Sequence, residues 1–107
     1  MVSRIVSFTV NPAKVDDFKA ALNNHFLPRL QALPGFVENI ESLDPQTGQF
    51  NCVTVWKSAA DEANYANGLF QEVAQAVTPI LLGDPTVKTL PVENSSAHGI
   101  KAGAATA

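Results

Sequence analysis

The sequence is poor in charge, and its charges do not cluster. Only 16% of the 107 residues are Asp, Glu, Lys or Arg, against about 25% in an average soluble domain. The net charge is −3, and the seven Lys and Arg residues are scattered along the chain, whereas a nucleic-acid-binding domain usually presents a basic stripe. We therefore expect no nucleic-acid partner, and a surface that a protein partner partly covers.

The chain also lacks the residues for a disulfide or a cysteine-rich metal site. It has one cysteine, Cys52, and two histidines, His25 and His98, whose spacing matches no metal-site motif. No apolar run approaches the ~20 residues of a membrane span, and polar residues interrupt the N-terminal segment where a signal peptide needs an apolar stretch. These absences predict a cytoplasmic protein with no metal ion and no membrane contact.

The residues that are present predict alternating strands and helices. Hydrophobic residues make up 46% of the chain, enough for one core in a chain of this length. Alternating β-branched and apolar residues predict strands, and apolar residues at steps of three and four predict helices. The predicted strands cover residues 2–10, 36–43, 50–56 and 86–92. The helical regions lie between the first and second strands and between the third and fourth.

Local signals mark where the helical regions begin, end and break. Asn11-Pro12 and Ser58 are typical of helix N-termini. Gly35 suits the left-handed conformation just past a helix end. Pro28 predicts a kink in the first helical region, and Asn67-Gly68 predicts a break in the second.

The second helical region has a predicted buried face that is rich in alanine. This face carries Ala60, Ala63, Ala66, Phe70, Val73, Val77 and Leu81. Asp61 and Glu62 fall in the first turn, where favourable interaction with the helix dipole explains both carboxylates. Tyr65 lies off the alanine-rich face.

The order β-α-β-β-α-β predicts an α+β, ferredoxin-like fold with a four-stranded antiparallel sheet. This domain covers residues 1–92, and a tail of small residues covers 93–107. In the third strand, Phe50, Cys52, Thr54 and Trp56 share one face, and Val53 and Val55 share the other. Helices cover only one face of such a sheet, so the second apolar face predicts a homodimer.

Two segments carry a resemblance to a known family. Leu33-Pro34-Gly35-Phe36 and Val53-Thr54-Val55-Trp56-Lys57-Ser58-Ala59-Ala60-Asp61 resemble the antibiotic biosynthesis monooxygenase (ABM) family. In that family a Pro-Gly-Phe turn precedes the second strand, and the third strand ends in Trp before a Ser-led helix. The resemblance spans roughly residues 2–92. It implies a dimeric α+β barrel with a ligand cleft between the sheet and the helices of each subunit.

The resemblance also limits the classes of reaction that we expect. ABM proteins include cofactor-independent oxygenases of quinol-like aromatics, haem-degrading oxygenases and proteins with no assigned reaction. Haem-degrading members use an Asn and a His at positions that are Val6 and Ala66 here, so we expect no haem and no other cofactor. Some quinol-oxidising members have an Asn where this chain has Cys52. The leading interpretation is a cofactor-independent monooxygenase with a cleft for a small aromatic or quinol-like molecule. The alternative is a non-catalytic ligand-binding or structural dimer.

Trp56 and His25 are the candidate catalytic residues. Trp56 can stack on a planar ligand and donate its indole N–H, or it can anchor the helix junction in the core. His25 borders the apolar face of the first helical region. It can act as a general base because its pKa lies near neutrality, or it can be an ordinary half-exposed helix residue.

Tyr65, Phe8 and Thr54 are the further candidates for contact with a ligand, together with Trp56. Tyr65 can hydrogen-bond a ligand carbonyl, or pack its ring at the boundary of the core. Phe8 and Thr54 belong to strand faces that we expect to form the floor of the cleft. Arg4 can bind an anionic group, although its early strand position favours exposure to solvent. Cys52 fits a small buried side chain.

Overall fold

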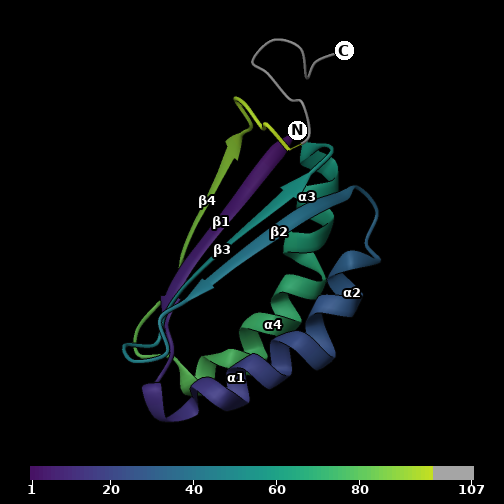
Figure 1. The fold of residues 1–107 in the computed structure, drawn as a ribbon. Coiled ribbons are helices and arrows are strands. Elements are labelled where there is room, and N and C mark those ends of the chain that lie inside the picture. The colour runs from purple at the N-terminus through teal and green to yellow at the C-terminus, as the bar shows by residue number, and fades with distance from the viewer. Residues whose placement is uncertain (98–107) are drawn as a thin grey trace.

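A computed structural model describes residues 1–97 of the protein. Four antiparallel strands form one sheet in the order β2-β3-β1-β4. The helices all lie on one face of this sheet (Figure 1). The strands are β1 (Val2–Thr9), β2 (Phe36–Leu43), β3 (Gln49–Trp56) and β4 (Thr86–Pro91). The predicted ferredoxin-like α+β fold is confirmed, and each strand boundary lies within one residue of its predicted place. Most of the predicted tail, including His98, lies outside the described residues.

The first helical region changes its winding before Pro28. A 3₁₀ turn, η1 (Pro12–Lys14), opens it, and Asn11 caps this turn by accepting a hydrogen bond from the Ala13 N–H at 3.0 Å. The region continues as α1 (Val15–Ala21), a π-helical turn η2 (Leu22–Phe26) and α2 (Leu27–Gln31). Proline cannot donate to the preceding turn and its ring crowds a carbonyl there. The predicted disruption at Pro28 therefore takes the form of a wider turn directly before it.

The second helical region breaks at the predicted place. It consists of α3 (Ala59–Asn67), α4 (Leu69–Val77) and a 3₁₀ turn, η3 (Thr78–Ile80). The Ser58 hydroxyl oxygen accepts a hydrogen bond from the Asp61 N–H at 3.1 Å, which confirms Ser58 as the N-cap. Gly68 lies between α3 and α4 with non-helical backbone angles.

The buried face of α3 differs from the predicted one. Ala60 and Ala63 are exposed, whereas Glu62 and Tyr65 are buried. The larger side chains reach the sheet, and their three-residue spacing keeps them on one helical face. The prediction that Ala60 and Ala63 face the core was therefore wrong. Periodicity alone does not show which of two adjacent rows of side chains on a helix faces the sheet.

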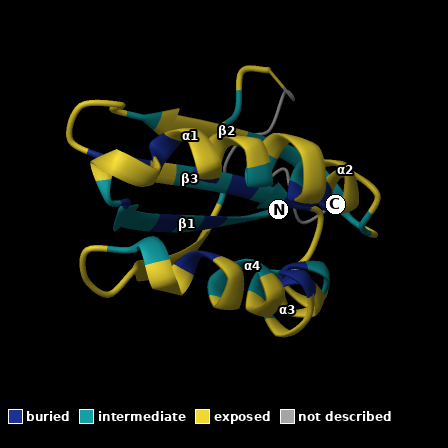
Figure 2. Cartoon of the chain, turned by 90° about the horizontal axis from the view of Figure 1, so that it is seen from below, coloured by how far each residue is buried: buried dark blue, intermediate teal, exposed yellow. Residues whose placement is uncertain are grey.

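The core fills the space between the helices and one face of the sheet. The two helical rows, α1–α2 and α3–α4, lie side by side over the strands (Figure 2). Trp56, at the end of β3, is 0% exposed. Its ring stacks on that of Tyr65 with centroids 4.9 Å apart, and its Nε1–H donates to Thr54 Oγ1 at 2.9 Å. The buried indole therefore has both a packing partner and a hydrogen-bond acceptor.

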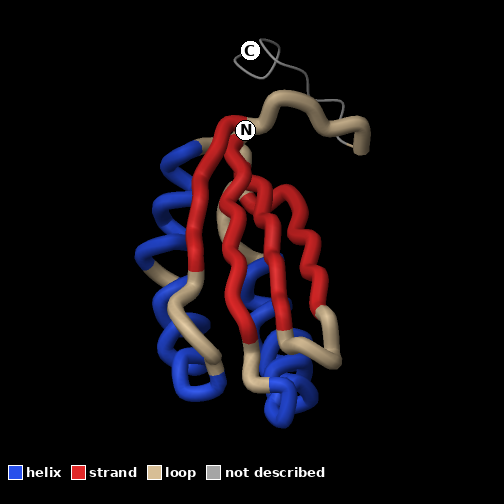
Figure 3. Tube along the Cα trace, turned by 90° about the vertical axis from the view of Figure 1, so that its left-hand side faces the viewer, coloured by secondary structure: helices blue, strands red, loops and turns tan. Residues whose placement is uncertain are grey.

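No described helix covers the opposite face of the sheet (Figure 3). In the strand register, Ile40 pairs with Val53, and Val53 pairs with Ile5, so three apolar side chains form one row. Val55 and Leu90 flank Ser3 in the next row. We call Ile5, Ile40, Val53, Val55 and Leu90 the outer apolar face. Ile40 is 56% exposed and Leu90 is 50% exposed, so this face is available to a partner.

Gly48 joins the β2–β3 loop to the end of β1. Its φ is +79°, a region that side chains other than glycine rarely adopt. Its carbonyl accepts a hydrogen bond from the Val10 N–H at 2.8 Å. A Cβ at this position would collide with the Val10 carbonyl oxygen. The close backbone approach therefore requires glycine.

We expect Gly48→Ala to lower the free energy of unfolding by about 3–5 kcal/mol, because a left-handed φ and a backbone collision both oppose it. Gly83→Ala is the matched control, since Gly83 also has a positive φ, +126°, but no atom lies within 4 Å of its would-be Cβ. We expect it to cost about 1–3 kcal/mol. Urea unfolding of both variants measures the difference, and equal losses would contradict the collision.

Candidate functional site

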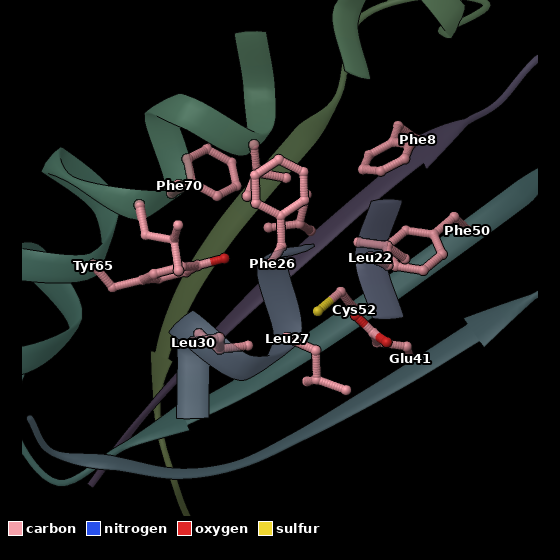
Figure 4. Close-up of a pocket in the computed structure, with 13 residues that line it drawn as sticks. Phe8, Leu22, Phe26, Leu27, Leu30, Glu41, Phe50, Cys52, Tyr65 and Phe70 are labelled. Atoms are coloured by element: carbon pink, nitrogen blue, oxygen red, sulfur yellow. The ribbon is translucent and has the colours of Figure 1, made fainter. Parts of the chain in front are cut away.

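An apolar cavity lies between the sheet and the two helical rows (Figure 4). Its volume is about 50 Å³. The strands contribute its floor, and η2, α2, α3 and α4 contribute its walls. The described residues that line it are Val6, Phe8, Leu22, Phe26, Leu27, Leu30, Glu41, Phe50, Cys52, Tyr65, Leu69, Phe70 and Val73. Only three of these side chains, Glu41, Cys52 and Tyr65, carry a titratable proton.

Tyr65 brings a hydroxyl group into the cavity from α3. Its hydroxyl oxygen points inward among the lining residues (Figure 4). The described structure shows no hydrogen bond from this hydroxyl to another residue. Burial raises the pKa of Tyr65 above its usual value, so the group stays protonated and can donate a hydrogen bond to a ligand oxygen.

Cys52 and Glu41 supply the polar atoms on the sheet side. They pair directly across β3 and β2. Burial, and then the nearby Glu41 charge, raises the pKa of the Cys52 thiol to about 12, so the thiol is not a nucleophile at neutral pH. Burial of its carboxylate raises the pKa of Glu41 although the residue as a whole is exposed. Glu41 therefore lies at the cavity mouth, between solvent and the apolar interior.

The predicted site residues divide into two groups. Phe8 and Tyr65 line the cavity. The other three, Trp56, Thr54 and His25, are not among the described lining residues. Trp56 is buried against Tyr65, and Thr54 is buried next to Trp56. His25 is exposed. The His25 ring packs edge-on against Phe26, with centroids 4.9 Å apart. The catalytic and ligand-binding roles of these residues stay predictions.

Arg4 does not point to solvent as expected. It is 9% exposed, and its Nη1 donates to Glu62 Oε2 at 2.9 Å. Its Cζ also lies 4.2 Å from the centroid of the Phe70 ring. Arg4 is on the helix-facing side of β1, where a partner on α3 can neutralise its charge. Glu62 is thus an ion-pair partner as well as a first-turn carboxylate.

Glu41 is the titratable lining residue that the sequence did not single out. The second strand is polar, which is typical of an exposed edge, and Glu41 is one polar residue among several. The register that places it opposite Cys52 is the signal that could have identified it. Strand pairing across the β2–β3 loop would have predicted this pair.

Within residues 1–97, no three His, Cys, Asp or Glu side chains are grouped closely enough to hold a metal ion. Among the same residues, no helix has the length and apolar character to cross a membrane. Val6 adds an apolar side chain to the cavity wall.

Comparison with solved structures identifies the architecture. A crystal structure described as an antibiotic biosynthesis monooxygenase superposes with a TM-score of 0.72 and 17% identity, covering 88% of this chain and all of the other. The chain has the fold of the ABM proteins. The match expected from the two sequence segments is therefore confirmed at the level of fold.

Two further ABM-fold structures agree. The monooxygenase of the Streptomyces coelicolor gene ActVA-Orf6, solved with the ligand nanaomycin D, has a TM-score of 0.72 and 16% identity, with 88% of each chain covered. Rv0793 from Mycobacterium tuberculosis has a TM-score of 0.72 and 16% identity, covering 89% of this chain and 97% of its own. No family model matches the sequence, and no curated protein matches it. At such identities the likeness establishes the ABM fold alone.

Because the pKa of Glu41 is raised in the folded protein, the free energy of unfolding should depend on pH. The unfolded chain loses this proton near the ordinary value of 4.5, whereas the folded protein keeps it to higher pH. Stability therefore falls as the pH rises from the unfolded to the folded pKa. We expect Glu41→Gln to stabilise the protein more at pH 7 than at pH 4, as measured by urea unfolding at both values. A gain that is the same at both pH values would contradict the burial of this carboxylate.

Proposed function

We propose that the protein is a homodimeric, cofactor-independent monooxygenase of a small quinol-like aromatic. The observation that carries this proposal is the apolar cavity in which Glu41, Cys52 and Tyr65 are the only titratable side chains among the described lining residues. An ABM-fold neighbour that was solved with nanaomycin D is called a monooxygenase, which supports an aromatic ligand in this fold.

The chemistry assigns separate tasks to the lining residues. Glu41 accepts the proton of a ligand hydroxyl, and its raised pKa brings it closer to the operating pH that suits a general base. Tyr65 donates a hydrogen bond to a second ligand oxygen. The apolar walls orient the ring. The deprotonated ring reacts directly with O₂: a hydroquinone and O₂ give a hydroxyquinone and water, with one oxygen atom in each product.

The cavity must widen when such a ligand enters. Its volume of about 50 Å³ is smaller than the engineered cavity of about 150 Å³ that accommodates benzene. Two backbone irregularities lie in its walls: the π turn Leu22–Phe26 and the break at Gly68. Both are places where a helix can shift without breaking regular α-helical hydrogen bonds.

We expect oxygen uptake in the presence of a hydroquinone to be faster with the protein than in buffer. Glu41→Gln should slow the protein-dependent rate by about 100-fold or more, because it removes the base. Tyr65→Phe should slow it by about tenfold through the loss of one hydrogen bond. An oxygen electrode measures both effects, with Gln75→Ala, on the exposed surface of α4, as the control.

The same assay tests the roles predicted for His25 and Trp56. If His25→Gln abolishes uptake and Glu41→Gln does not, the base is His25 and the assignment to Glu41 fails. Trp56→Phe keeps an aromatic ring beside Tyr65 but removes the indole N–H. We regard Trp56 and Thr54 as positioning residues that hold Tyr65, so Trp56→Phe should change the rate less than Tyr65→Phe does. Uptake no faster than in buffer would exclude the monooxygenase.

Two observations favour the non-catalytic alternative. The cavity is small, and the Trp56 indole N–H is already satisfied by Thr54 inside the core. A ligand-binding dimer without turnover needs no general base. Saturable binding of a quinone together with no oxygen uptake would establish this alternative.

The homodimer proposal rests on the outer apolar face. Apolar side chains from all four strands lie on a sheet surface that the described helices do not cover. Every residue of β4 is exposed in the single chain. A second copy packed face to face would bury these side chains, and burial stabilises by about 25 cal/mol per Å² of apolar surface.

We expect sedimentation at micromolar concentration to give about twice the 11.4 kDa mass of one chain. Ile40→Lys should raise the dimer dissociation constant at least tenfold, because it places a charge in the apolar contact. The fold should tolerate it, since Ile40 is exposed in the single chain. Gln75→Lys on α4 is the matched control. A wild-type monomer, or an Ile40→Lys dimer of unchanged affinity, would contradict this interface.

A further inference from the structure

Arg4 is a buried cation next to the cavity, and one of its donors has no acceptor. It lies two residues before Val6 on the helix-facing side of β1, and Val6 lines the cavity. Its Nη1 is hydrogen-bonded to Glu62. Its Nε is buried with no hydrogen-bond partner among the described residues. Buried donors are nearly always paired, so an unpaired one beside a ligand cavity indicates a place for an acceptor from outside the chain.

Phe70 contacts Arg4 and also lines the cavity, whereas Arg4 is not among the described lining residues. The Phe70 ring lies over the guanidinium, with Cζ 4.2 Å from the ring centroid. The same ring lines both the main cavity and a second cavity of about 30 Å³. Val6, Phe8 and Val73 also line both. Displacement of the Phe70 ring would therefore join the two spaces and uncover the guanidinium.

The two contacts of Arg4 come from different helices. Glu62 is on α3 and Phe70 is on α4, and Gly68 interrupts the backbone between them. A shift of α4 can move Phe70 while the Arg4–Glu62 ion pair stays in place. The guanidinium offers Nε–H and one Nη2–H side by side, a planar fork that matches two oxygen lone pairs. Glu62 binds at Nη1, so this fork remains free of the ion pair.

We propose that Arg4 binds an ionised oxygen of the aromatic ligand at the edge formed by its Nε–H and Nη2–H, which becomes accessible when the Phe70 ring moves. The class of ligand is a phenolate or a hydroxyquinone anion. This inference rests on the proposed function for the aromatic nature of the ligand. The charge of Arg4 stabilises the deprotonated form of the substrate, which is the form that reacts with O₂.

Two quinones of similar shape test the proposal by isothermal titration calorimetry at pH 7. The probes are 2-hydroxy-1,4-naphthoquinone, which is ionised at this pH, and 1,4-naphthoquinone, which has no ionisable group. We expect the wild-type protein to bind the ionised probe about tenfold more tightly, the difference expected of one charge-assisted hydrogen bond. Glu62→Gln should increase this preference, because the competing carboxylate is gone.

The decisive variant is Arg4→Gln/Glu62→Gln. It replaces both members of the buried ion pair with neutral amides, so neither charge is left unpaired in the core. We expect it to bind the two probes equally and to keep the wild-type affinity for 1,4-naphthoquinone. Equal wild-type affinities for the probes, or a preference that persists in the double variant, would overturn the role of Arg4. Both results are independent of oxygen uptake, whereas failure of both probes to bind would overturn the proposed function as well.

Discussion

The stacking of Trp56 on Tyr65 is the interaction on which the cavity depends. It joins the last residue of β3 to the buried face of α3, with the two rings 4.9 Å apart and nearly parallel. Burying an indole is favourable only if its N–H finds an acceptor, and Thr54, two residues earlier on the same strand face, supplies it. The stack fixes the Tyr65 ring, and the ring in turn directs the hydroxyl group into the cavity. A strand residue outside the cavity lining thus decides where the main hydrogen-bond donor inside it lies.

The fold was predictable because its determinants are local. The N-caps at Asn11 and Ser58, the glycine after the first helical region and the break at Gly68 each depend on a few neighbouring residues, and all were found in place. The ion pair between Arg4 and Glu62 was not predictable in this way, since 58 positions separate its members. Only the packing of α3 on β1 brings them together, and neither residue alone indicates that it is buried.

The cavity was predictable in part. Phe8 and Tyr65 were identified from strand alternation and from the position of a lone tyrosine beside an apolar stripe. Glu41 was missed because a carboxylate on a polar strand has no distinguishing feature until the strand register is known. His25 lies within the π turn, where the 3.6-residue period used to place it on the border of the apolar face no longer applies. The wider turn leaves this histidine exposed, next to the ring of Phe26.

The stacked pair has a consequence for how the protein can be observed. Trp56 and Tyr65 are the only tryptophan and the only tyrosine in the sequence, and they are in contact with each other. Nearly all of the near-ultraviolet absorption of the protein therefore arises from one ring that lines the cavity, Tyr65, and from the indole that stacks on it. Any molecule that touches the Tyr65 hydroxyl changes the surroundings of one half of this chromophore pair. The protein thus carries a built-in optical reporter of what its cavity contains, with no other fluorophore of that kind to obscure the signal.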